Sequence, residues 1–194
     1  MHTSDQKPDG QRQALLEAIL RNSFMRGRFQ LASGAWSDYY LDLRRTTLHP
    51  EGLNVAISVL WPALVEAQVD SLGGPTLGAD PLVAGLILES HRRKLPMRGF
   101  LVRASVKEHG TGRQIEGHCP AGARVAILDD VVTRGGSILR ALEAVRSAGA
   151  QPVLALALVD REEGARERLA SEGVPLYAPL CVSEILEAAA ERGL

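Results

Sequence analysis

Apolar positions along the chain switch repeatedly between helical spacing and short unbroken runs. Between Pro50 and Gln68 they recur at helical spacing behind a proline in the first turn, which predicts a helix. Two later runs, 125–128 and 153–159, are continuous and end in acidic residues, as strands buried on both faces do. The whole pattern predicts strands at 69–72, 100–102, 125–128, 153–159 and 176–179, and helices at 50–68, 80–93, 136–148, 164–171 and 183–192. This alternation is typical of an α/β fold with a central, mostly parallel sheet flanked by helices.

The first 45 residues have a different pattern. Residues 13–20 are spaced as a helix, and 29–31 and 39–43 alternate as two strands around the turn Ser33-Gly34. We interpret 11–45 as a small N-terminal hood and 50–194 as the parallel-sheet core of one domain, 11–194. Residues 1–10 are polar and contain no hydrophobic signal segment, so we expect a flexible N-terminus there.

Composition excludes several classes of protein. The 194 residues include 22 basic and 23 acidic side chains, and this near-neutral balance argues against a nucleic-acid binder. No apolar run approaches the roughly 20 residues that a membrane span needs, so no membrane partner is expected. Cys119 and Cys181 lie far apart and match no metal or redox spacing, which favours free thiols and a cytoplasmic location.

The richest candidate chemistry follows the strand at 125–128. Two acids, Asp129 and Asp130, come directly after it, and the short loop Thr133–Ser137 then opens a helix. Free backbone N–H groups at a helix start bind phosphate, whereas carboxylates suit ribose hydroxyls, a cationic transition state or a metal ion. A bare acidic pair could equally cap the helix. With the apolar strand before it and Gly135-Gly136-Ser137 after it, a sugar-phosphate site is favoured.

A second candidate is the segment 104–124, which shows little periodicity. Structureless loops longer than about 12–15 residues are uncommon in compact domains and are usually functional or mobile. This one contains Lys107, although only three of the 22 basic residues are lysine. Without further information a solvated polar loop is the favoured interpretation of Lys107 and His109.

Four segments resemble known sequences. Residues 127–137 (ILDDVVTRGGS) resemble the phosphoribosyl-pyrophosphate (PRPP) signature of type I phosphoribosyltransferases. Residues 103–113 (RASVKEHGTGR) are similar to the mobile catalytic loop of the orotate phosphoribosyltransferase family, and 73–81 and 31–42 also resemble that family. The resemblance implies the type I phosphoribosyltransferase fold with an N-terminal hood and a mobile catalytic loop at 104–117.

The resemblance also implies a reaction and its residues. Orotate and PRPP would give orotidine 5′-monophosphate (OMP) and pyrophosphate in pyrimidine biosynthesis, with Mg²⁺ held mainly by PRPP and reached through water by the acidic pair. A homodimer is implied, in which the catalytic loop acts across the interface. Thr133 and Arg161 would bind orotate, and the catalytic group would comprise Lys107, His109, Asp129 and Asp130. The implied PRPP-binding residues are Thr76, Leu77, Arg103, Lys107, His109, Asp129, Asp130, Val131, Val132, Thr133, Arg134, Gly135, Gly136 and Ser137.

The chain departs from the family at three positions. Many members have lysine where Ala32, Gly78 and Ala104 stand, so either PRPP binds more weakly or Arg44, Arg45 or Arg113 compensates. Trp36, Tyr39 and Tyr40 could equally wall the base pocket or pack the hood. Two alternative functions remain at this stage: transfer to a purine or uracil instead of orotate, and a non-catalytic PRPP-sensing regulator.

Overall fold

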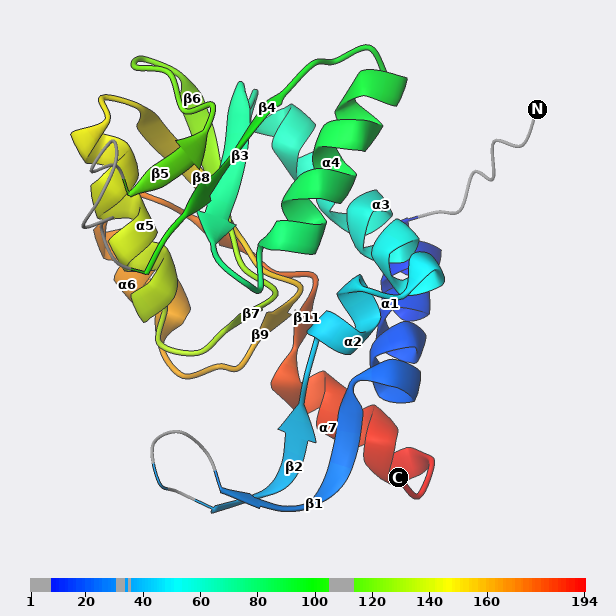
Figure 1. Ribbon diagram of the computed structural model, residues 1–194. Helices are drawn as coiled ribbons and strands as arrows, with labels where there is room; N and C mark the ends of the chain where they lie inside the picture. The colour runs from blue at the N-terminus through cyan, green and yellow to red at the C-terminus, as the bar shows by residue number, and fades with distance from the viewer. Residues whose placement is uncertain (1–7, 31–33, 35, 105–113) are drawn as a thin grey trace.

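The computed structural model describes residues 8–30, 34, 36–104 and 114–194. Its N-terminal part is a helix followed by a hairpin, as expected (Figure 1). The helix starts earlier than the expected residue 13, however, so residues 8–10 are helical and the expected flexible segment 1–10 is wrong at its C-terminal end. The elements are α1 (Pro8–Asn22), β1 (Phe24–Gln30), β2 (Trp36–Leu41) and a short α2 (Arg44–Thr47).

The main sheet has six strands in the order β10-β8-β6-β3-β4-β5. All neighbouring pairs are parallel except β4 and β5, which are antiparallel. The edge strand β5 falls within the 104–124 segment, where no strand was expected. The strands are β3 (Ser71–Pro75), β4 (Arg98–Val102), β5 (Ile115–Gly117), β6 (Arg124–Leu128), β8 (Gln151–Leu156) and β10 (Leu176–Tyr177).

Helices cover both faces of this sheet because its strands are apolar on both faces (Figure 1). Successive side chains of a strand point to opposite faces. Accordingly, Ala126 and Leu128 of β6 belong to one buried cluster, and Val125 and Ile127 to the other. The first cluster is covered by α3 (Pro50–Glu66) and α4 (Asp80–Arg92), and the second by α5 (Gly136–Ser147) and α6 (Ala165–Ser171).

A second, three-stranded parallel sheet lies at the end of the main sheet. The expected strand 153–159 is divided, because β8 stops at Leu156 and the chain re-enters a different sheet at Val159. This sheet has the order β11-β9-β7, and α7 follows it directly. Its members are β7 (Val131–Val132), β9 (Val159–Asp160) and β11 (Leu180–Cys181), followed by α7 (Val182–Glu191).

The expected α/β architecture is therefore confirmed.

Polar contacts attach the N-terminal elements to the C-terminal end of the chain. An Arg12–Glu184 ion pair joins α1 to α7, and Arg26 of the hairpin donates from Nη1 to the Leu194 carbonyl at 2.6 Å. Among the helices described, none combines the length and apolar character that crossing a membrane requires.

Candidate functional site

The acidic pair lies where β6 ends. Asp129 and Asp130 are each only 8% exposed. The Ser137 hydroxyl, from the first turn of α5, donates to Asp129 Oδ2 at 2.8 Å, and the Asp130 backbone N–H donates to Asp129 Oδ1 at 3.0 Å. The Val131 N–H donates to Asp130 Oδ1 at 2.9 Å. Local hydrogen bonds thus fix both carboxylates, and within the described residues neither one forms a salt bridge.

Burial makes both acids hard to ionise. Burial, followed by the neighbouring Asp130 charge, raises the pKa of Asp129 to about 7, against the lowering effect of the Ser137 hydroxyl. Burial also raises the pKa of Asp130. Two buried acids that share one small volume bind a hydroxyl-rich or cationic group well, because such a group satisfies their oxygens without adding negative charge.

The turn after β3 lies directly against this pair. A Cβ atom built on Gly78 would come within 2.5 Å of Asp129 Oδ1 and of Asp130 Oδ1, so a larger residue would displace both carboxylates. The peptide bond between Thr76 and Leu77 is cis. Gly78 therefore lets the turn and the acids approach each other.

The start of α5 forms the third part of the candidate site. Gly135, its N-cap, has a φ of +74°, a conformation that favours glycine. Thr133 and Arg134 are exposed, and the Arg134 carbonyl accepts a hydrogen bond from Arg168 at 2.6 Å. No side chain caps the helix, so its first N–H groups remain available to an anion.

These three segments enclose a cavity of about 120 Å³. It lies beside Asp129 and Ser137 and is bounded by the β3 turn and the end of β4. Arg103 is half-exposed and lines the cavity, and its Nη1 lies 3.6 Å from Glu116 Oε1. The lining residues are Pro75, Thr76, Val102, Arg103, Ala104, Gln114, Asp129, Ser137, Arg140 and Ala141.

Arg161 occupies the neighbouring strand end. Val132 and Asp160 are register partners in β7 and β9, and the Arg161 N–H donates to the Val132 carbonyl at 2.8 Å, so Thr133 and Arg161 emerge side by side. The guanidinium donates to Tyr39 Oη at 3.2 Å and lies 5.6 Å from the Tyr39 ring centroid. Its Nε is buried and forms no hydrogen bond in the described part of the chain, although Glu163 Oε1 lies 3.2 Å away.

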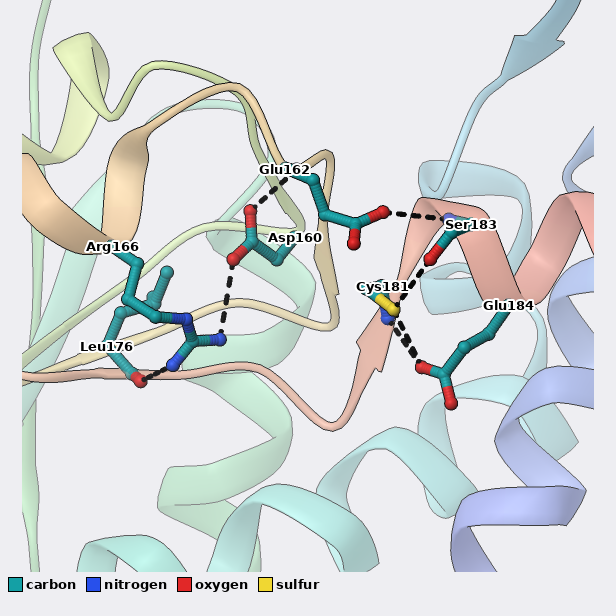
Figure 2. A network of polar contacts seen from close by, with 7 residues as sticks. All are labelled: Asp160, Glu162, Arg166, Leu176, Cys181, Ser183 and Glu184. Atoms are coloured by element: carbon teal, nitrogen blue, oxygen red, sulfur yellow. Dashed lines mark hydrogen bonds and ion pairs between the residues drawn. The ribbon is translucent and has the colours of Figure 1, made fainter.

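Polar contacts on both sides hold the Arg161 segment (Figure 2). Asp160 accepts from the Glu162 N–H at 2.9 Å and from Arg166 at 3.3 Å. Glu162, at a positive φ of 59°, accepts from the Ser183 N–H at 3.0 Å and so caps α7. The chain on either side of Arg161 is therefore fixed to two different helices.

The structure brings four of the expected site residues to one cavity. Thr76, Arg103, Asp129 and Ser137 line one cavity. Leu77, by contrast, is 67% exposed and lines a separate hollow with Arg44, whose pKa is raised first by Asp42 and also by Asp130. Of the remaining expected residues, Ala32, Lys107, His109 and Arg113 lie outside the described residues.

Sequence reasoning missed two polar residues that line the cavity, Gln114 and Arg140. The spacing of Arg140, four residues after Gly136, could have placed it on the same helix face. Tyr39 stacks on Phe24 within the hood, which agrees with the packing interpretation, and it also touches Arg161. That these aromatic residues wall a base pocket stays a prediction. Trp36 is 58% exposed beneath Arg28, whose guanidinium carbon lies 4.6 Å from the ring centroid.

The residues present suit Mg²⁺ only in part. Carboxylate oxygens are ligands that Mg²⁺ accepts, and the acidic pair supplies them. Within the described ranges no group of three or more His, Cys, Asp or Glu side chains comes together. A magnesium ion here would therefore take further ligands from water and substrate oxygens, as Mg²⁺ bound with phosphates commonly does.

Comparison with known proteins decides the family. The protein family described as "Phosphoribosyl transferase domain" matches residues 82–174 of this chain. An orotate phosphoribosyltransferase of Rhodopseudomonas palustris (strain BisB5) is 44% identical over 178 residues, which cover 89% of this chain and 95% of the relative. The chain belongs to the orotate phosphoribosyltransferase family. The expected family and its type I fold are confirmed, and membership makes this protein one of a transferase family.

Solved structures of the family have the same fold. Orotate phosphoribosyltransferase of Mycobacterium tuberculosis H37Rv, in complex with Fe(III) dicitrate, superposes with a TM-score of 0.81 at 36% identity, over 90% of this chain and 98% of that one. The same protein in complex with PRPP superposes with a TM-score of 0.76 at 32% identity, over the same shares.

Proposed function

We propose that this protein transfers the 5-phosphoribosyl group of PRPP to orotate, giving OMP and pyrophosphate for pyrimidine biosynthesis. The observation that supports this most strongly is the buried acidic pair held against the start of α5 in a chain that matches orotate phosphoribosyltransferases over nearly its full length. The PRPP complex of the M. tuberculosis relative supports PRPP as the donor.

The chemistry is a displacement at C1 of the ribose. The bond from C1 to pyrophosphate oxygen breaks with its electron pair, and the sugar is cationic in between. N1 of orotate forms the new bond to C1, and the N1 proton leaves to the pyrophosphate or to water. Asp129 and Asp130 accept from the ribose hydroxyls and stabilise that positive charge, and the N–H groups of 133–137 bind the 5-phosphate. Mg²⁺, when bound with PRPP, neutralises negative charge on the pyrophosphate.

The acceptor base would lie beside β7 and β9. Arg161 has a buried Nε without a hydrogen bond in the described part of the chain, and Thr133 emerges next to it. A guanidinium suits the orotate carboxylate, since its planar donors match the two carboxylate oxygens. This charge pairing favours orotate over adenine, hypoxanthine or uracil, none of which carries a carboxylate.

The finer features of the enzyme belong to the same proposal. Arg103, Lys107 and His109 supply positive charge to the departing pyrophosphate, and the catalytic loop at 104–117 excludes water and acts across a homodimer. The pattern of two free cysteines fits a cytoplasmic location. These assignments rest on the resemblance of 103–113 to the family's loop.

Pyrophosphate release tests the function. The protein is incubated with PRPP and Mg²⁺ and with orotate, uracil, adenine or hypoxanthine in turn. Orotate should be the preferred acceptor by at least about a hundredfold, because the other bases carry no carboxylate for the Arg161 guanidinium to bind. The matched control is Arg161→Gln, which should lose orotate preference. Equal release with a purine, or tight salt-sensitive RNA binding without release, would refute the proposal.

A further inference from the structure

One cation in the active-site cavity has no role in the scheme above. Arg140 lies in the second turn of α5 and lines the cavity together with Thr76, Arg103, Asp129 and Ser137. Side chains four residues apart share one face of a helix. Arg140 accordingly folds back over the start of α5, where its Nη1 lies 3.7 Å from a Cβ atom built on Gly136.

Arg140 is exposed, and its guanidinium lies beside the positively polarised start of α5. The N-terminal turn of a helix carries partial positive charge, so a cation held beside it is repelled. Within the described residues Arg140 forms no hydrogen bond or ion pair, whereas Arg146 on the same helix is bonded to Glu172 at 2.6 Å. The carboxylate of Asp129 lines the same cavity, but it is engaged by Ser137. The guanidinium is thus left free to meet an incoming anion.

We propose that Arg140 binds the pyrophosphate group of PRPP, an inference that rests on the proposed function. Ala104, at a position where many family members have lysine, lines the same cavity opposite α5. Arg140 therefore supplies, from the helix side, a positive charge that a lysine at 104 would supply from the strand side. The other lining groups support pyrophosphate as the anion, because Thr76 and Arg103 belong to the segments assigned to it, and the 5-phosphate is assigned to backbone N–H groups.

The first experiment measures pyrophosphate binding directly. Titration calorimetry of Arg140→Gln with inorganic pyrophosphate and Mg²⁺ should show about a tenfold loss of affinity, the size expected for a lost charge-assisted hydrogen bond. Arg146→Gln is the matched control, since it removes the same charge from the same helix outside the cavity, and its affinity should be unchanged. Ribose 5-phosphate should bind equally well to both variants.

The second experiment moves the charge. Ala104→Lys in the Arg140→Gln background should recover most of the pyrophosphate affinity and the KM for PRPP, with the KM for orotate unchanged throughout. Thermal melting checks that each variant is folded. Pyrophosphate affinity equal in Arg140→Gln and Arg146→Gln, a loss confined to ribose 5-phosphate, or no recovery with Ala104→Lys would overturn the assignment. Because binding of pyrophosphate needs no acceptor base, failure of orotate turnover alone would refute the proposed function and leave this inference standing.

Discussion

At the scale of single residues, Asp129 faces two opposing requirements. Its side chain must be buried to lie against the β3 turn and the start of α5, yet burial, together with the Asp130 charge, raises its pKa to about 7 from an ordinary value of 3.8. A group whose pKa is raised in the folded state stabilises the fold only while it stays protonated. The free energy of unfolding therefore falls as the pH rises from about 4 to about 7, where the native carboxyl also ionises.

Asp129→Asn should separate stability from catalysis. The neutral amide carries no charge to bury, and the Ser137 hydroxyl can turn to suit it, so the variant should be more stable than the wild type at pH 8 by on the order of 2 kcal/mol. The gain should shrink at pH 5. Turnover should nevertheless fall by about 10²–10³-fold, because the charge that stabilises the ribosyl cation is lost.

Chemical denaturation at pH 5 and pH 8 without Mg²⁺ or PRPP measures the first effect, and pyrophosphate release measures the second. Asp9→Asn is a matched control, an exposed acid in the first turn of α1. The free energy of unfolding of Asp9→Asn should change between pH 5 and pH 8 by the same amount as that of the wild type. A wild-type protein that is equally stable at pH 5 and pH 8 would contradict the burial of an ionisable Asp129. An active Asp129→Asn variant would contradict its role in stabilising the ribosyl cation.

At the scale of elements, the sequence predicted long segments well and short ones poorly. The strand at 125–128 and the helix from Gly136 were predicted to within about a residue, because apolar spacing persists over several positions. Two-residue strands such as β7 and β11 have no measurable period, and α2 has only four residues. The run 153–159 stays apolar across two sheets since both are buried, so its division could not be predicted.

The loop after β9 depends on a contact that no local pattern reveals. Glu162 caps α7 from 21 residues away, and it lies next to Arg161. We expect Glu162→Gln to raise the KM for orotate about three- to tenfold while the KM for PRPP stays constant, because a weaker cap frees the Arg161 backbone. Loss of the charged cap should also cost about 1 kcal/mol of stability.

Steady-state kinetics with each substrate varied in turn checks this prediction. Ser183→Ala is the matched control, since the contact to Glu162 uses the Ser183 backbone N–H, whereas the Ser183 hydroxyl hydrogen-bonds to the Cys181 thiol. Its KM values should match those of the wild type. A rise in the KM for PRPP of equal size would indicate general loosening of the fold and contradict the positioning role.

At the scale of the whole molecule, the site divides into a part that one stretch of sequence encodes and a part that folding assembles. Asp129, Asp130 and the turn through Ser137 were predictable because strand, acids and helix start are contiguous. The position of Arg140 in the cavity was not predicted, because the sequence does not show which elements pack beside each face of a helix. The contact of Tyr39 with Arg161 spans 122 residues, so the sequence left its role open between pocket wall and packing.

The proposed homodimer makes a prediction that concerns two chains at once. If Lys107 acts in the partner's site, then Lys107→Ala and Asp129→Asn damage different subunits' contributions to one site. Each homodimer should be nearly inactive. When equal amounts are mixed and allowed to exchange, half of the dimers are hybrids, and each hybrid has one site with both residues intact. The mixture should therefore reach about a quarter of wild-type turnover.

Native mass spectrometry of differently tagged subunits verifies that exchange has occurred, and pyrophosphate release from PRPP and orotate gives the turnover. Mixing Lys107→Ala with wild type is the control, because its hybrids also keep one intact site each. If the loop served its own subunit, every hybrid site would lack one of the two residues and mixing would recover nothing. Activity that stays at the level of the separate variants, with hybrids present, would therefore place Lys107 in its own chain's site and remove the reason for an obligate dimer.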